Sequence, residues 1–169
     1  MKRSKCVEIK VYIVNLDMYN EGVLQGSWFT LPVDFDFVSE KIGLNDKYKK
    51  YLIKDFESPI DIPEYIPVVE LNNMYNKLCE VEEHGIEECD MKEVISRMGG
   101  LDELYCKLDS IVNHGHISFD EYIYDFLEEQ FDSSGIDMRL LSCIDYDMYV
   151  GYLRTEENFI EASNLYQLV

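Results

Sequence analysis

Strict alternation of apolar and polar positions opens the chain. Every second residue over 7–13 is valine or isoleucine, which is the period of a strand with one buried face. Two further apolar runs lie at 23–31 and 51–56, and between them Asp34 can cap a short helix that Gly43 would stop. The opening part of the chain therefore predicts a small unit of three strands and one helix.

A proline-rich segment separates this unit from a stretch with helical periodicity. Pro59, Pro63 and Pro67 each disfavour helix in the preceding residue, so they predict a hinge. Beyond the hinge, apolar residues recur at three- to five-residue steps in three short runs. The apolar face expected for the first run comprises Val69, Met74, Leu78 and Val81. Helices this short can bury their faces only against one another or a neighbour, so a small helical bundle is predicted.

The last part of the chain mixes both periods. Ser118, with Glu121 three positions later, predicts a capping box for a helix from 119 to about 131. The other predicted elements are a brief strand at 111–112, helical structure at 138–152 and a terminal hairpin at 159–169. The apolar face expected for the second helical stretch comprises Ile144, Met148 and Tyr152.

These elements define the expected architecture. The fold class is α+β, with an N-terminal α+β domain at 1–60 that holds a three-stranded sheet and a helix. A helical domain follows at 61–108, and a C-terminal α+β domain occupies 109–169.

Charge is strongly unbalanced along this chain. Its 169 residues include 34 acids and 15 Lys/Arg, for a net charge of −19, although 47% of residues are apolar and can form a core. Residues 1–60 hold nine acids and nine bases, which leaves 25 acids and six bases for residues 61–169. A folded polyanion repels nucleic acid and anionic membrane and attracts basic proteins. We therefore expect a basic protein partner, with no nucleic acid and no membrane as partners.

The cysteines and the N-terminus bear on the compartment. Five cysteines are scattered without a CxxC pair, which predicts reduced, buried thiols in a cytoplasm rather than a disulfide framework. The basic start leads into alternating residues rather than an apolar run, so no signal peptide is expected, and no stretch approaches the length of a membrane span. The prediction is a soluble, cytoplasmic protein.

Two patterns resemble metal sites only superficially. Cys106, His114 and His116 invite a zinc interpretation, but the second half of a four-ligand site is missing. Asp145 and Asp147 match positions one and three of a calcium-binding loop, yet Val150 stands where that loop requires glycine. We favour a solvated turn for the first pattern and a helix for the second, and expect neither metal nor cofactor.

The sequence also offers little for catalysis. It contains no phosphate-binding glycine loop, no GxSxG and no HExxH. Adjacent carboxylates such as Glu128 and Glu129 need a pocket that separates their pKa values, and in a chain with 34 acids such pairs arise by chance. We therefore expect a protein that is not an enzyme.

Two dense acidic segments are the main candidate for function. The first contains Glu80, Glu82, Glu83, Glu87, Glu88 and Asp90, and the second contains Asp120, Glu121, Asp125, Glu128, Glu129 and Asp132, in both cases without an intervening Lys or Arg. Any single acid is best explained as part of a solvated helix face, but a merely soluble surface would mix in Lys to avoid repulsion. Acids three to four positions apart on a helix are about 5 Å apart along its axis. That spacing approaches the charge spacing of one phosphate backbone of duplex DNA, which carries about one charge per 1.7 Å of axis, or about 3.4 Å per strand.

Several motifs resemble the ArdA antirestriction family. They are Val11-Tyr12-Ile13-Val14-Asn15-Leu16, Tyr19-Asn20-Glu21-Gly22, Gly26-Ser27-Trp28-Phe29-Thr30-Leu31-Pro32 and Ile42-Gly43-Leu44-Asn45-Asp46. A looser likeness covers 122–129 and 144–149. The order and spacing of these blocks are specific, and the likeness extends over essentially the whole chain.

The resemblance carries functional expectations. It implies an elongated three-domain protein, carried by mobile genetic elements, that forms a homodimer through its C-terminal domain. Such a dimer imitates bent B-form DNA and occupies the DNA groove of type I restriction-modification enzymes, at their methyltransferase core. The antirestriction motif would fall at about 122–149, which adds Asp145 and Asp147 to the target-binding acids. Family members tend to be acidic in the first domain, whereas residues 1–60 here are neutral.

Other functions remain open on the residues alone. The alternative to a restriction inhibitor is an acidic adaptor that binds another basic protein. A calcium-binding module is the third possibility, and Val150 argues against it. Competition with DNA separates the first two, because an adaptor need not occupy a DNA groove.

Overall fold

Two small antiparallel sheets organise the protein. The computed structural model describes residues 6–156 and 158–169. The chain divides into two units, Met1–Lys92 and Glu93–Val169, and each is built around one three-stranded sheet. This mixture of helices and sheets confirms the α+β class. The division into three domains stays a prediction, since the boundary between the two units falls inside the expected helical domain.

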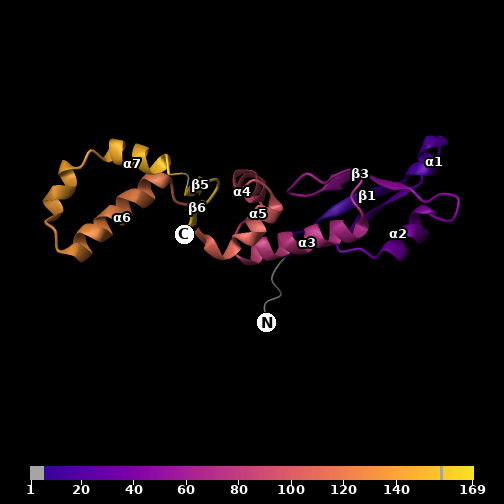
Figure 1. Cartoon of the computed structure of the whole chain (residues 1–169), viewed down its shortest axis with the longest axis horizontal. Coiled ribbons are helices and arrows are strands. Elements are labelled where there is room, and N and C mark those ends of the chain that lie inside the picture. Colours follow the sequence, from indigo (N-terminus) through magenta and orange to yellow (C-terminus); the bar gives the residue numbers. More distant parts are fainter. Residues whose placement is uncertain (1–5, 157) are drawn as a thin grey trace. The chain divides into compact units, whose positions relative to one another are not determined.

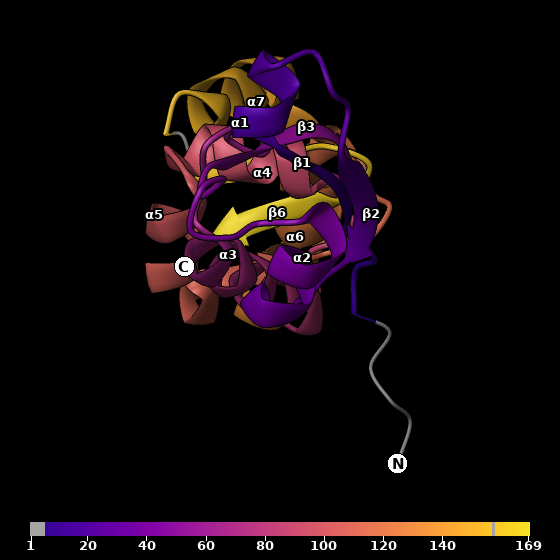
Figure 2. The ribbon, with the colours of Figure 1, turned by 90° about the vertical axis from the view of Figure 1, so that its right-hand side faces the viewer.

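The first unit contains the elements predicted for the opening of the chain. Its sheet has the order β2-β1-β3, and Figures 1 and 2 both show α2 and α3 on the same side of it. The elements are β1 (Lys10–Asn15), α1 (Leu16–Asn20), β2 (Gly26–Thr30), α2 (Phe35–Ile42), β3 (Tyr51–Glu57) and α3 (Val68–Glu83). The three strands and α2 are confirmed, with Asp34 capping α2 and Gly43 ending it in the left-handed conformation at φ 70°. The pattern missed α1, a five-residue helix without a buried residue and therefore without apolar periodicity.

Helix α3 is present where predicted but turns a different face to the core. Its buried residues include Val68 and Leu71, whereas Val69 is 69% exposed. The expectation that Val69 faces the core is therefore wrong. Val68 and Val69 are both apolar, and adjacent residues lie about 100° apart around a helix. The sequence therefore does not decide which of the two faces the core, and packing against the sheet buries Val68.

A disulfide in the first unit corrects the expectation of reduced thiols. Cys6 and Cys79 are bonded, with Cα atoms 5.2 Å apart and 73 positions between them in sequence. Such a pair has no local signature, because only the packing of α3 beside the segment before β1 brings the two residues together. The thiols of Cys89, Cys106 and Cys143 are exposed, so the expectation that they are buried is also wrong.

The second unit combines a sheet of order β4-β6-β5 with two longer helices. Its elements are α4 (Met91–Met98, which begins at the end of the first unit), α5 (Leu101–Cys106), the 3-10 helix η1 (Leu108–Ser110), β4 (Ile111–Asn113), α6 (Phe119–Ser134), the 3-10 helix η2 (Met138–Cys143), α7 (Tyr146–Arg154), β5 (Phe159–Glu161) and β6 (Leu165–Leu168). The predicted terminal hairpin is confirmed as β5 and β6, which pair antiparallel. The brief strand and the capped helix are confirmed as β4 and α6.

Helix α7 occupies the residues that resemble a calcium loop. Asp145 caps it by accepting a hydrogen bond from the N–H of Met148 at 3.1 Å. The helical interpretation is therefore confirmed, but its expected apolar face is wrong, since Met148 is 71% and Tyr152 60% exposed. Val150 is buried in the core of the unit instead.

No helix within the described residues is long and apolar enough to cross a membrane. Those residues also contain no group of three or more His, Cys, Asp or Glu side chains placed to hold a metal ion. His114 contacts Gln167, with 3.0 Å between Nε2 and Oε1, and His116 contacts the carbonyl oxygen of Ser163 through Nδ1 at 2.7 Å.

Candidate functional site: the acidic face of helix α6

Helix α6 is held at both ends by local interactions. Ser118 accepts a hydrogen bond from the N–H of Glu121, and the Glu121 carboxylate accepts one from the N–H of Ser118, which completes the capping box. Gly135 ends the helix at φ 68°, a left-handed conformation that glycine adopts without steric cost. The sequence therefore fixes the length of α6.

An apolar stripe fixes which way α6 faces. Phe119, Ile123 and Leu127, at steps of four, are 2–8% exposed and pack with Val150 and Leu165. At 3.6 residues per turn these three positions lie within about 80° of the helix circumference. Because this stripe enters the core of the second unit, the opposite face of α6 is turned to solvent.

Five carboxylates occupy that opposite face. They are Glu121, Asp125, Glu128, Glu129 and Asp132. At 100° per residue they span about 100° of the circumference, centred almost opposite the apolar stripe. All are exposed except Glu128, which is half-buried. We call these five residues the acidic stripe.

The mean axial spacing of the carboxylates in the acidic stripe is about 4 Å, close to the spacing of about 3.4 Å between phosphates of one DNA strand. Glu121 and Asp132 are 11 residues apart, or about 16 Å at 1.5 Å per residue. One strand of duplex DNA carries about five phosphates in that length. The stripe therefore presents about one carboxylate for each phosphate of a single strand.

Tyr124 and Tyr146 connect α6 and α7. The phenol of Tyr124 donates a hydrogen bond to Glu128, which raises its pKa. Burial raises the pKa of Tyr146, and the nearby charge of Asp120 raises it further. The phenol of Tyr146 also donates to the carbonyl oxygen of Asp120, and its ring meets that of Tyr124 edge-on at 5.8 Å between centroids. These contacts tie α7 to the start of α6.

Asp120 differs from the residues of the acidic stripe because it forms an ion pair with Arg154. Its Oδ1 accepts a hydrogen bond from Nη2 of Arg154 at 2.9 Å, and Nη1 of Arg154 donates to Glu161 at 3.2 Å. Arg154 also lies over the ring of Phe119, with 4.7 Å from Cζ to the ring centroid. Sequence reasoning grouped Asp120 with the free acids and missed this ion pair, since 34 positions separate the two residues.

Two other candidate acids also have structural partners. Glu121 is part of the capping box, and the bonds from the hydroxyl and N–H of Ser118 lower its pKa. Asp145 caps α7, as described above. Asp147, in the first turn of α7, is exposed. The structure thus places the acids of the second segment on α6, and Asp145 and Asp147 at the start of α7. Asp120, Glu121 and Asp145 also have local stabilising roles.

The first acidic segment lies in the other unit. It covers the end of α3 and the loop that follows, where Glu80, Glu83, Glu87 and Glu88 are exposed. Glu82 is half-buried and Asp90 is 1% exposed. We therefore leave Asp90 out of any proposed surface, because a buried carboxylate cannot meet a partner's cation. The two segments belong to different units.

Helix α6 thus presents a row of carboxylates to solvent on a small α+β scaffold. In comparison with protein families, the model of the antirestriction protein family ArdA matches residues 11–167. The chain belongs to the ArdA family. The curated proteins contain no match to it.

Proposed function

We propose that this antirestriction protein acts as a charge mimic of duplex DNA. It would occupy the DNA-binding groove of a type I restriction-modification enzyme, at the methyltransferase core, and inhibit the enzyme without catalysis. The observation that carries the proposal is the acidic stripe, whose carboxylates are about as many as the phosphates of one DNA strand over the same length.

The physical basis is electrostatic. A groove that binds DNA presents Lys and Arg side chains to phosphates and gains affinity as counterions are released. A rigid helix with five carboxylates on one face offers these side chains the same partners. The capping box and the apolar stripe hold the carboxylates in place before binding, so less ordering is needed on contact.

The assembly and setting belong to the same proposal. A homodimer formed through the C-terminal α+β region would present two acidic stripes and lengthen the imitated duplex. The first acidic segment, without Asp90, would supply further contacts. The site of action is the cytoplasm, where an incoming mobile genetic element meets the restriction enzyme of its new host.

One titration tests the proposal. The purified protein is added to a type I methyltransferase already bound to a fluorescently labelled duplex, and the anisotropy of the duplex is followed. Stoichiometric release of the DNA is expected. If the DNA stays bound at saturating protein while the two proteins associate, the charge-mimic mechanism is wrong and an acidic adaptor is the better description.

A further inference from the structure

The C-terminal sheet of the second unit has an open edge. Strand β5 is last in the order β4-β6-β5, so among residues 6–156 and 158–169 it pairs with β6 alone. Asn158 accepts a hydrogen bond from the N–H of Leu168 at 2.8 Å, and Ala162 donates one to the carbonyl of Asn164 at 2.9 Å. Because backbone groups alternate in direction along a strand, those of Phe159 and Glu161 point away from β6.

Two cavities adjoin β5. One, of about 250 Å³, is lined by all three residues of β5, namely Phe159, Ile160 and Glu161. The second, of about 330 Å³, shares Phe159 and Ile160 with the first and also reaches Leu168. Successive strand residues point to opposite faces of a sheet. The first cavity is lined by residues that point to both faces and so adjoins the edge of β5, whereas Leu168 of the central strand β6 places part of the second cavity over a face of the sheet.

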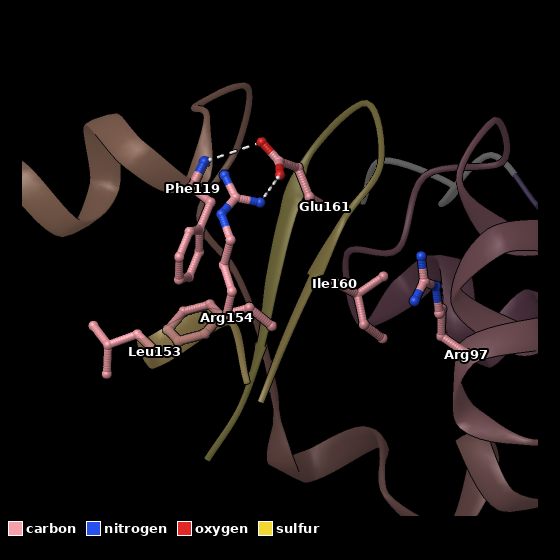
Figure 3. Close-up of a pocket in the computed structure, with 7 residues that line it drawn as sticks. Arg97, Phe119, Leu153, Arg154, Ile160 and Glu161 are labelled. Atoms are coloured by element: carbon pink, nitrogen blue, oxygen red, sulfur yellow. Dashed lines mark hydrogen bonds and ion pairs between the residues drawn. The ribbon is translucent and has the colours of Figure 1, made fainter. Parts of the chain in front are cut away.

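Cations flank the edge on both sides. Arg97 and Arg154 line both cavities, and the exposed side chain of Lys107 lines the larger one, which has no carboxylate in its lining. In Figure 3, Arg154 lies with Phe119 on one side of the hairpin, whereas Arg97 lies with Ile160 on the other. Residues 61–169 contain only six Lys and Arg, and half of them gather here.

The two arginines keep hydrogen-bonding capacity for a ligand. Nε of Arg97 donates to Glu93 at 2.9 Å, while Arg154 donates to Asp120 and Glu161. A guanidinium group carries five N–H donors, so each arginine retains donors beyond these bonds. The neighbouring carboxylates hold both guanidinium groups in place at the edge.

We propose that the free edge of β5 binds an extended acidic peptide segment of a partner protein by strand addition, with two adjacent carboxylates of the segment meeting Arg97 and Arg154. The outward backbone groups of Phe159 and Glu161 would pair with the incoming strand. Adjacent residues of that strand point to opposite faces, as the two arginines require. A single small anion fits less well, because the hairpin separates the two guanidinium groups.

The test uses the full chain and three synthetic peptides. The first is Ac-Thr-Val-Asp-Glu-Val-Thr-NH2, the second carries Asn-Gln in place of Asp-Glu, and the third has proline in place of both valines. Calorimetry measures affinity, and amide hydrogen exchange follows Phe159 and Glu161. The acidic peptide should bind and slow exchange at these two amides, and each altered peptide should bind about tenfold more weakly.

Matched variants locate the site. Arg97→Gln should weaken binding of the acidic peptide by about tenfold. Arg139→Gln makes the same charge change in the same unit, but Arg139 lies on η2, where its side chain is 90% exposed and paired with Asp137, and it should leave binding unchanged. The melting temperature of each variant verifies its fold.

Three outcomes would overturn the proposal. They are an equal loss of binding in both variants, undiminished binding of the proline peptide, and no binding of the acidic peptide at all. In the last case the cations serve only to keep the edge from pairing. None of these measurements involves a restriction enzyme, so the result is independent of the proposed inhibition.

Discussion

Neutralising part of the acidic stripe should make the protein more stable and a weaker inhibitor. The triple variant Asp125→Asn, Glu129→Gln and Asp132→Asn changes charge while keeping side-chain shape. All three residues are exposed. They lie on the face of α6 opposite its apolar stripe. The variant therefore leaves the core and the capping box intact.

The gain in stability follows from like-charge repulsion along the helix. Five pairs in the stripe stand three or four positions apart and include a substituted residue: 121 with 125, 125 with 128, 125 with 129, 128 with 132, and 129 with 132. Each such pair destabilises a helix by about 0.2–0.5 kcal/mol, so the variant should gain about 1–2.5 kcal/mol at low ionic strength. For a unit of this size, about 1 kcal/mol corresponds to a rise in Tm of about 4–8 °C.

The loss of inhibition follows from the contacts removed. An exposed ion pair contributes about 0.2–1 kcal/mol. Three lost pairs therefore cost about 0.6–3 kcal/mol, which weakens displacement of DNA between about threefold and about 150-fold. A single substitution should fall at the small end of that range, because the potential is summed over many charges.

Thermal melts at low salt and the DNA-release titration measure the two effects. The control variant, Asp46→Asn with Asp55→Asn and Glu64→Gln, removes the same charge from exposed positions of the first unit. It should release DNA as the unmodified protein does. Equal weakening by control and stripe variants would show that net charge alone acts, and a lower Tm for the stripe variant would refute the repulsion argument.

Other consequences can be measured directly. Ser118→Ala should cost about 1 kcal/mol by removing the cap. The bonds from Ser118 lower the pKa of the Glu121 carboxyl below its ordinary 4.5. The part of the cap's stabilisation that depends on this carboxylate is therefore present above that pH and lost as pH falls through the depressed value, so the difference in Tm between variant and parent should narrow in acid. Reducing the bond between Cys6 and Cys79 should destabilise the first unit by about 4 kcal/mol on the chain-entropy estimate for a loop of this length, and denaturant unfolding with and without reductant would show no difference if the bond is immaterial. Since residues 1–60 are neutral, we expect this protein to inhibit methylation by the type I enzyme at lower doses than DNA cleavage or translocation by the same enzyme. Similar doses for these activities would contradict this expectation.

Much of the secondary structure was predictable because its signals are local. Alternation over 7–13, the caps at Asp34 and Ser118 and the stops at Gly43 and Gly135 each act within a few residues of chain. The acids of α6 were also predictable as candidates, since their spacing relative to the apolar stripe follows from the helical period alone.

Side-chain partnerships across the chain depended on tertiary structure. Nothing near Cys6 indicates Cys79, and nothing near Asp120 indicates Arg154, because these contacts exist only when distant elements pack together. Val69 shows the same limit within a helix, where two adjacent apolar residues leave the buried face undecided until the helix meets its sheet. The sequence by itself determined the charge and the local elements, because both are properties of neighbouring residues. Only the tertiary structure decided which acids stay free, which are paired, and where the few cations gather.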